Sequence, residues 1–325
     1  RVSSTAMPIE PVALFLFAHQ DDEFGVYERI ASLRRQGRRV ACAYLTDGQT
    51  ASASAATRNA ESLAVLARLG VDAHEVRFAG AELGIGDARL PLHREPGADW
   101  TGAWLDGFSP IESIHVTAGE GGHHDHDALH ALTVQLAAQR GLLERTWQFT
   151  LYQANGLPGP LFRVFAPLPE NGPVSTLPIA WRARLRHLRH CLSYPSQRNT
   201  WIGLFPFVAL HYLVHGAERL QPVSLARLEQ RPHPGPLYYE KRKFFTWQRM
   251  EAALAAWRSA PPSAGPSAPP APRPPPRPAG RRRTATPARC WRWHCASCSP
   301  GCCSAASACT RGSSPTSGIT ARWRA

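Results

Sequence analysis

The chain has 325 residues, enough for one large domain or two smaller ones. Its formal charge of +13 at pH 7 is unevenly spread, because residues 259–325 hold ten arginines, no lysine and no acidic residue. Residues 1–258 therefore carry a formal charge of only +3. A strongly basic surface of the kind that binds nucleic acid is confined to the tail, so we expect no nucleic-acid partner for the rest of the chain.

Cysteine usage and hydropathy exclude two further classes of protein. Only two of the eight cysteines, Cys42 and Cys191, precede the tail, so no disulfide framework is predicted and a reducing compartment is expected. The longest late apolar run, residues 201–214, is too short to span a bilayer. No signal peptide is recognisable, because the first apolar run is short and leads directly into charged residues. We therefore expect a cytoplasmic protein without a membrane span, of unknown oligomeric state.

The first strongly apolar stretch, Val12–Ala18, has the length of a strand that is buried on both faces. Helical and strand patterns alternate after it. The expected elements up to residue 153 are helix 24–36, strand 39–46, helix 55–69, strand 73–78, an irregular stretch 79–110, strand 111–117, a helix ending at residue 140 and strand 147–153. This rhythm predicts an α/β fold, a Rossmann-like doubly wound and mostly parallel sheet with helices on both faces.

The part beyond residue 153 shows a weaker pattern. It predicts a loop over 157–178, helices 179–192 and 201–214, an irregular stretch 221–236 and a last helix 241–257. We expect an N-terminal extension (1–10), one domain (11–258) and a low-complexity tail (259–325).

The tail is rich in proline, arginine and cysteine, and its apolar content is too low for a core. We predict that it is disordered, or that it is an out-of-frame translation. A small zinc knuckle built on the C-x-x-C pair Cys295 and Cys298 is an alternative interpretation of the tail.

A polar cluster, His19-Gln20-Asp21-Asp22-Glu23, directly follows the first strand. The carboxyl ends of parallel strands are where ligands bind in such sheets. One imidazole and three carboxylates have the composition of a metal site, with one carboxyl group left over that is not needed as a ligand. The alternative is a solvated helix start, because carboxylates also stabilise the first turn of a helix.

A second cluster, His123-His124-Asp125-His126-Asp127, follows strand 111–117 and a glycine-rich turn, and it opens the next helix. Both clusters thus follow strands of the predicted sheet, so we expect them to converge. Histidine nitrogens and aspartate oxygens around an open position are typical of catalytic zinc. We expect the glycines before His123 to give a tight turn and room for a substrate.

A rival metal pair is His126 with His130, whose i, i+4 spacing resembles half of an H-E-x-x-H zinc helix. Asp127 then stands where that motif has glutamate. If His130 is no ligand, we expect it on the helix surface, and we expect His124 in a solvated loop.

Together the two clusters resemble the motifs of the PIG-L/LmbE family of zinc-dependent N-deacetylases. Residues 19–23 (H-Q-D-D-E) are similar to the family's A-H-P-D-D-E, and residues 123–126 (H-H-D-H) to its H-x-D-H. Residues 58–61 (R-N-A-E) resemble its R-x-x-E helix. The resemblance covers roughly residues 11–250. Gln20 replaces the usual proline, which removes backbone rigidity but no reactive group.

The resemblance implies a hydrolase that removes an acetyl group from an N-acetylated amino sugar or its conjugate, of the N-acetylglucosamine type. The implied cofactor is Zn²⁺ and the implied partner is a small-molecule amino sugar. The implied metal ligands are His19, Asp22 and His126.

The resemblance also implies the catalytic residues. Asp21 would act as the general base, His123 would polarise the amide carbonyl, and Asp125 would orient a histidine. Arg58 would contact the substrate.

Two other functions stay open. One is an amidase that acts on a thiol or antibiotic conjugate with the same metal site. The other is a non-catalytic sugar- or nucleotide-binding domain, although no glycine fingerprint for a dinucleotide follows the first strand. Trp100 and Trp104 either stack on a sugar or belong to the core.

Overall fold

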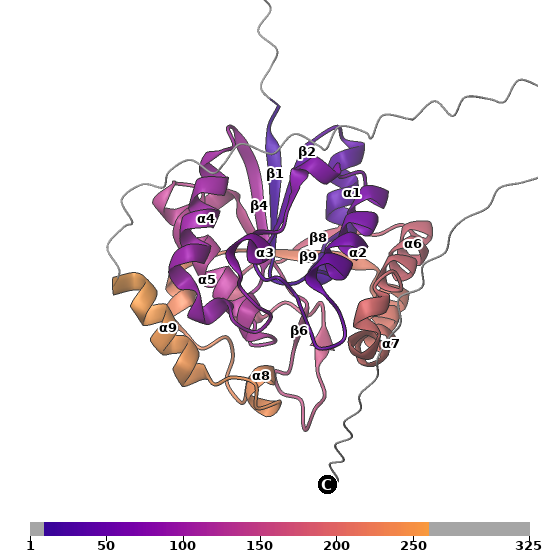
Figure 1. The fold of residues 1–325 in the computed structure, drawn as a ribbon. Coiled ribbons are helices and arrows are strands. Elements are labelled where there is room, and N and C mark those ends of the chain that lie inside the picture. The colour runs from indigo at the N-terminus through magenta and orange to yellow at the C-terminus, as the bar shows by residue number, and fades with distance from the viewer. Residues whose placement is uncertain (1–9, 260–325) are drawn as a thin grey trace, which may run out of the picture. The chain divides into compact units, whose positions relative to one another are not determined.

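The structure, a computed structural model, describes residues 10–259. A seven-stranded sheet with the order β3-β2-β1-β4-β5-β9-β8 forms its centre (Figure 1). Its strands are β1 (Val12–Phe17), β2 (Arg39–Tyr44), β3 (Val76–Arg77), β4 (Ile111–Thr117), β5 (Thr146–Phe149), β8 (Ser175–Pro178) and β9 (Ala217–Pro222). The first five strands run parallel, and β9 and β8 extend one edge antiparallel. The predicted α/β fold with a mostly parallel sheet is confirmed, and the order β3-β2-β1-β4-β5 is that of a Rossmann-like sheet.

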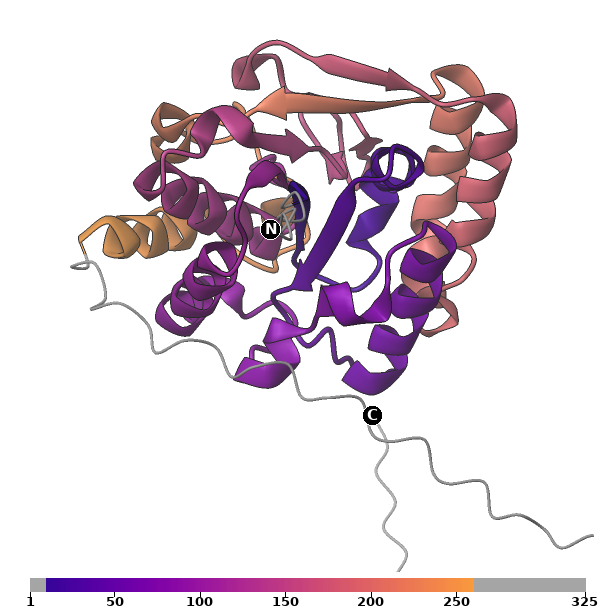
Figure 2. The same ribbon diagram turned by 90° about the horizontal axis from the view of Figure 1, so that it is seen from above.

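Helices cover both faces of the sheet (Figures 1 and 2). One layer consists of α1 (Tyr27–Arg35), α2 (Ala55–Arg68), α6 (Trp181–Cys191) and α7 (Arg198–Val214). The other consists of α4 (Arg94–Asp106), α5 (His124–Gln139) and α9 (Trp247–Ser259). Short helices α3 (Ala79–Leu83) and α8 (Tyr238–Lys241) and a two-stranded sheet of β6 (Tyr152–Gln153) and β7 (Arg163–Val164) lie in the connections.

Strand β1 lies between the two helical layers and contributes to both hydrophobic cores. Its side chains alternate, so that Phe15 and Phe17 pack in the α1–α2 layer and Leu14 and Leu16 in the α4–α5 layer. All six residues of β1 are buried. The unbroken apolar run that predicted this strand is the expected consequence of burial on both faces.

The stretch 79–110 is more regular than predicted, because it contains α3 and α4. Pro96 and two glycines lower the helix propensity of α4, so its sequence shows no helical pattern. Tertiary burial compensates: Trp104 and Leu105 pack in the second core with α5. The expectation of an irregular segment was wrong for this reason.

The second half of the chain also differs from the expectation in detail. Helices α6 and α7 lie where they were predicted, but the strand predicted at 147–153 is split into β5 and β6. The predicted loop 157–178 contains β7 and β8, and the predicted last helix begins at Trp247, after the separate α8. Strand β9 carries the mixed sequence A-E-R-L-Q-P, which gives no continuous apolar signal.

No helix within residues 10–259 is long and apolar enough to cross a bilayer. The predicted N-terminal extension up to residue 9 and the tail from residue 260, with its C-x-x-C pair, lie outside the described residues. The predicted domain boundaries therefore stay predictions.

Candidate active site

The two polar clusters lie at the carboxyl ends of neighbouring strands. β1 and β4 pair in parallel, from Val12 opposite Ile111 to Leu16 opposite Val116. The loop with His19 leaves β1, and α5 begins directly after the loop that leaves β4. Residues about a hundred positions apart in the sequence therefore meet at one edge of the sheet.

Three side chains of these loops form a compact donor group. His19 Nδ1 lies 3.3 Å from His126 Nε2, which lies 3.1 Å from Asp22 Oδ1. Asp22 Oδ2 lies 3.6 Å from His19 Nδ1. Around a tetrahedral cation with bonds of about 2.0–2.1 Å, neighbouring ligand atoms are about 3.3–3.4 Å apart. The donor group therefore fits one divalent cation, with all three side chains buried.

Asp22 is held in this position by the backbone. Its Oδ2 accepts hydrogen bonds from the N–H groups of Ala18 at 3.0 Å and His19 at 2.8 Å. Burial alone would raise the pKa of the Asp22 carboxyl, but His126 and His19 hold that pKa well below its usual range. Asp22 is therefore an anionic donor.

Asp125 orients the ring of His19. His19 Nε2–H donates to Asp125 Oδ2 at 3.0 Å, which leaves the Nδ1 lone pair directed at the donor group. The N–H groups of Ala88 and Leu90 donate to the same carboxylate at 2.7 and 3.0 Å. Asp125 thus joins the second cluster to the first and to the loop before α4.

Asp21 lies beside the donor group and not in it. Its backbone has φ 109°, an unusual value for a residue with a side chain, and its N–H donates to Glu23 Oε2 at 3.0 Å. Burial raises the pKa of the Asp21 carboxyl to about 8, against the opposing effect of Arg58. Glu23 itself turns toward the core, where Tyr194 Oη donates to it at 2.8 Å.

Arg58 joins three loops around the site. Its guanidinium donates to the carbonyls of Gly48 and Gln20, both at 2.6 Å, and lies 3.4 Å from Asp21 Oδ1. Asp87 Oδ2 lies 3.6 Å from the same group. Arg58 also lines the cavity described below. Holding these loops is a structural task that the sequence did not suggest.

His123 stands edge-on to His19, with ring centroids 4.6 Å apart. Its Nδ1 accepts the backbone N–H of Asp125 at 3.2 Å, so the hydrogen of the neutral ring sits on Nε2. Burial and the neighbouring His19 lower the pKa of His123 well below its usual value. His123 is therefore a neutral hydrogen-bond donor at the cavity.

Asp87 is a site residue that sequence reasoning missed. Its Oδ1 lies 3.3 Å from His19 Nε2, and it forms a second group of potential cation ligands with His19, His123 and Asp125. It belongs to the connection between α3 and α4, where a single aspartate after a glycine reads as an ordinary turn. Only the fold brings it to the site.

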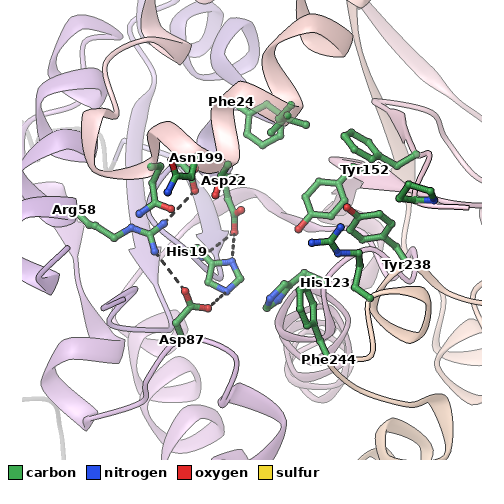
Figure 3. A pocket seen from close by; sticks show the side chains of 18 residues that line it. His19, Asp22, Phe24, Arg58, Asp87, His123, Tyr152, Asn199, Tyr238 and Phe244 are labelled. Atoms are coloured by element: carbon green, nitrogen blue, oxygen red, sulfur yellow. Dashed lines mark hydrogen bonds and ion pairs between the residues drawn. The ribbon is translucent and has the colours of Figure 1, made fainter. Parts of the chain in front are cut away.

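A cavity of about 570 Å³ opens over these residues (Figure 3). Its aromatic lining consists of Phe24, Tyr152, Phe162, Tyr238 and Phe244. The N-terminal part of α7 forms another wall, with Asn199, Thr200, Gly203 and Leu204. Only Phe162 of this aromatic lining comes from a segment that was predicted as a loop, because Phe24 and Phe244 belong to predicted helices and Tyr152 to a predicted strand.

Trp100 and Trp104 do not line this cavity. They stack on each other on α4, with ring centroids 5.9 Å apart, and Trp104 is buried in the second core. Their interpretation as core residues therefore holds.

His130 and His124 are buried, contrary to the expectation. His130 Nδ1–H donates to the carbonyl of Thr117 at 3.1 Å, and His124 Nε2–H donates to that of Ala88 at 3.1 Å. His124 also stacks on Phe245. Neither histidine belongs to a donor group among the described residues, so the rival pair of His126 with His130 is not supported. His124 is covered by the loop at Ala88 and by the rings of Tyr239 and Phe245, and His130 lies against the backbone at the end of β4.

Gln20, which replaces the proline of the family motif, anchors its loop through its side chain. Nε2 donates to Asn59 Oδ1 at 2.7 Å and to the carbonyl of Thr46 at 3.3 Å. A Cβ atom at Gly48 would lie 1.9 Å from Gln20 Oε1, so this contact requires glycine there. Hydrogen bonds thus replace the rigidity of the proline ring.

The glycines before His123 serve the protein backbone. Gly121 has φ +71°, and a Cβ atom at Gly122 would lie 2.1 Å from the carbonyl oxygen of Tyr152. The tight turn was predicted correctly. The space that was predicted for a substrate is instead filled at Gly122 by the backbone of Tyr152, the first residue of β6.

The fold and the site define a class: a Rossmann-like α/β protein with a buried His-Asp-His donor group, fit for a divalent cation, at the ends of β1 and β4. Residues 14–137 match the family model PIG-L, described as GlcNAc-PI de-N-acetylase. The match contains both motifs and confirms the predicted resemblance to the PIG-L/LmbE family over these residues. It supports an enzyme of the deacetylase class, which hydrolyses amide bonds.

Solved structures of deacetylases share the fold. A deacetylase of the teicoplanin biosynthesis pathway is 17% identical, with 66% of this chain and 98% of that chain covered and a TM-score of 0.51. A40926 pseudoaglycone deacetylase and a zinc-inhibited form of teicoplanin deacetylase have the same identity and coverage, with TM-scores of 0.50. At this identity the similarity establishes the fold alone. No curated protein matches the chain.

Proposed function

We propose that the chain is a metal-dependent N-deacetylase that hydrolyses the acetamide group of an N-acetylated amino sugar or its conjugate. The single observation that carries this proposal is the donor group of His19, Asp22 and His126 beside a carboxyl, Asp21, that lines the same cavity. A cation site with an acid that is not a ligand is what amide hydrolysis requires. The match of residues 14–137 to the PIG-L family model supports the same reaction.

The proposed cofactor is Zn²⁺, held by His19 Nδ1, His126 Nε2 and an oxygen of Asp22. Three protein ligands of this kind leave a fourth position open. When bound, Zn²⁺ supplies Lewis acidity at the amide oxygen and lowers the pKa of water. Asp125 keeps His19 in the tautomer that ligation needs.

Asp21 is the proposed general base. Its carboxylate accepts the proton of the water molecule that attacks the acetamide carbon. The C–N bond then breaks, the same carboxyl returns the proton to the leaving nitrogen, and the products are acetate and a free amine. Arg58, 3.4 Å away, fixes the carboxylate and favours its anionic form.

His123 is the proposed stabiliser of the oxyanion. Nδ1 accepts the Asp125 N–H, which puts the ring hydrogen on Nε2, and no described residue accepts a hydrogen bond from Nε2–H. A neutral donor at the cavity stabilises negative charge as it develops on the carbonyl oxygen. The lowered pKa keeps the ring in this neutral, singly protonated form.

The lining of the cavity supports an amino sugar as the substrate. Tyr152, Tyr238 and Phe244 offer aromatic faces for the apolar side of a sugar ring. Asp87 and Arg58 offer charged groups for hydroxyls. A cavity of about 570 Å³ is large enough for a sugar with a substituent.

The test combines metal content with product analysis on the full chain. We expect about one zinc per chain, with acetate release from N-acetylglucosamine or its glycosides. His126→Ala should lose both, whereas Asp21→Asn should lose acetate release and keep the zinc. Zinc without acetate release would point to another amide, such as a thiol or antibiotic conjugate. A folded chain that binds no metal would support the non-catalytic binding domain instead.

A further inference from the structure

Helices α6 and α7 carry an apolar face that the described part of the chain leaves uncovered. Of the twelve large hydrophobic side chains that are exposed within residues 10–259, seven lie between residues 181 and 214. They are Trp181, Leu185, Leu192, Ile202, Leu210, Leu213 and Val214. Scattered apolar residues are normal on a surface, but such a concentration on two neighbouring helices marks an interaction site.

On α7 the exposed apolar residues lie opposite the buried ones. Leu204 and Val208 pack in the first core, whereas Ile202, Leu210 and Leu213 form a stripe along the outer side. Ile202 is 65% exposed, so most of its side chain is in contact with water.

Helix α6 repeats this arrangement. Ala183 and Cys191 face the core, and Trp181, Leu185 and Leu192 face away from it. The two helices are in contact and lie side by side (Figures 1 and 2). Because both bury one side in the same core, both turn their exposed apolar side chains away from that core. We call the seven exposed residues and the arginines beside them the α6–α7 face.

The α6–α7 face is also strongly basic. Residues 181–215 contain five arginines and no aspartate or glutamate. Arg182, Arg186 and Arg189 lie next to the apolar stripe of α6, are exposed, and make no ion pair with any described residue. Arg184 differs, because it donates to the carbonyls of Ile179 and Tyr212.

We propose that the α6–α7 face docks the protein on the surface of a membrane that contains anionic lipids. The apolar side chains would enter the boundary between headgroups and acyl chains, and the unpaired arginines would bind lipid phosphates. Trp181 at the start of α6 is of the type that favours this boundary. No helix of the described residues crosses the bilayer, so the attachment is peripheral.

A second copy of the chain fits this face less well. A symmetric pair would bring the same arginines against each other, and no acidic side chain of residues 181–215 could compensate. An anionic membrane satisfies both parts of the face, because the headgroup–acyl boundary accepts the apolar side chains and the lipid phosphates pair with the arginines.

Docking would also place the cavity beside the membrane. Asn199, Gly203 and Leu204 line the cavity from α7, the helix that carries Ile202 and Leu210 on its outer side. Docking itself needs neither a metal nor a substrate, so it stands apart from the proposed deacetylase activity.

The test is sedimentation of the full chain with vesicles of phosphatidylcholine alone or mixed with phosphatidylglycerol. We expect binding to the anionic vesicles, and a drop of at least about tenfold in the partition coefficient for Ile202→Asp/Leu213→Asp. The matched control is Leu92→Asp/Leu225→Asp, which introduces the same charge at exposed leucines elsewhere and should keep most of the binding. Thermal unfolding verifies that each variant is folded.

The arginine-rich tail is a competing source of vesicle binding, and it is identical in all variants. If both double variants bind like the parent chain, the tail alone drives binding and the proposal fails. It also fails if the Ile202 and Leu213 substitutions disperse an oligomer in sedimentation velocity while vesicle binding is unchanged, because the face then joins two copies. Arg182→Gln/Arg186→Gln/Arg189→Gln, which retains the apolar stripe, should weaken binding to anionic vesicles and reduce its dependence on salt.

Discussion

Asp125 Oδ2 accepts a hydrogen bond from Nε2 of His19 at 3.0 Å, although 106 positions separate the two residues. This bond joins the two sequence motifs into one site and decides which nitrogen of His19 faces the donor group. It also makes the geometry of the loop after β1 depend on the first turn of α5. The first prediction follows from this bond.

Asp125→Asn should weaken Zn²⁺ binding by about 10–100-fold, because an amide no longer accepts the His19 hydrogen as strongly and the ring loses its orientation. Competition with a chromophoric chelator measures the change. Asp106→Asn, on the exposed end of α4, serves as the control. Equal affinities in the two variants would show that Asp125 does not position the ligand.

Removal of the metal should abolish acetate release and lower the stability of the protein without unfolding it. Asp22 keeps its two backbone hydrogen bonds in the absence of a cation, so the loop stays formed. At a free Zn²⁺ concentration of 100 times Kd, the holo form should be about 2.7 kcal/mol more stable. Thermal unfolding before and after chelation, with Zn²⁺ added back, measures this. A melting temperature that does not depend on Zn²⁺ would contradict specific binding.

Asp21→Asn should lower kcat by about 10²–10⁴-fold and leave the metal content unchanged. Asparagine keeps the size of the side chain but accepts no proton. Because Asp21 is buried with a raised pKa, a neutral replacement should cost little folding stability. Full turnover in this variant would exclude Asp21 as the general base.

Gly48→Ala should destabilise the protein more than Gly37→Ala does. Both glycines have a positive φ, +63° and +76°, so both variants carry a backbone penalty of about 1–2 kcal/mol. Only at Gly48 does the new Cβ also collide with Gln20, whereas nothing lies within 4 Å at Gly37. Chemical denaturation compares the two variants. Equal losses would mean that Gln20 moves aside freely.

His115 should contribute to the sensitivity of the fold to acid. The ring is fully buried on β4, stacks on Phe15 and accepts a hydrogen bond from Arg29 Nε at 3.2 Å. Burial and the charge of Arg29 lower the pKa of His115 from 6.5 to about 3. As the pH falls through 6.5 the unfolded chain binds this proton and the folded chain does not, so stability is present above pH 6.5 and lost toward pH 3.

The measurement is the free energy of unfolding of His115→Phe and the parent chain at pH 7 and pH 5. Between these two values the parent chain should lose about 2 kcal/mol more than the variant, because the phenylalanine keeps the stacked ring but binds no proton. Parallel pH profiles would contradict this role.

The sequence predicted the site where its residues directly follow recognisable strands. His19 and Asp22 come after an unbroken apolar run, and His126 comes after the strand predicted at 111–117, so a parallel sheet was enough to bring them together. Asp87 could not be found this way, because it lies in a connection with no repeat in its hydropathy. The burial of His124 and His130 was equally hidden, since it results from contacts with segments elsewhere in the sequence, such as Phe245 over His124 and the end of β4 beside His130.

The missed elements share a physical cause. Helix α4 and strand β9 have weak intrinsic preferences and form because of what they pack against. In α4 the stabilising contacts come from Trp104 and Leu105, and in β9 from antiparallel pairing with β5 and β8. Propensity and periodicity describe a segment by itself and carry no information about such neighbours.

Strands β1 and β4 pair directly, so the residues that follow these two strands and the stretch of chain between them can evolve separately. Between β1 and β4 the chain adds β2 and β3 to one side of the same sheet, and helix α2 and the α3–α4 connection of this stretch deliver Arg58 and Asp87 to the rim of the cavity. The loops of this stretch can change where they do not support the donor group, whereas Ala88 and Leu90 must keep their hydrogen bonds to Asp125. New substrate preferences can therefore arise by substitutions at the rim of the cavity, with the donor group inherited intact.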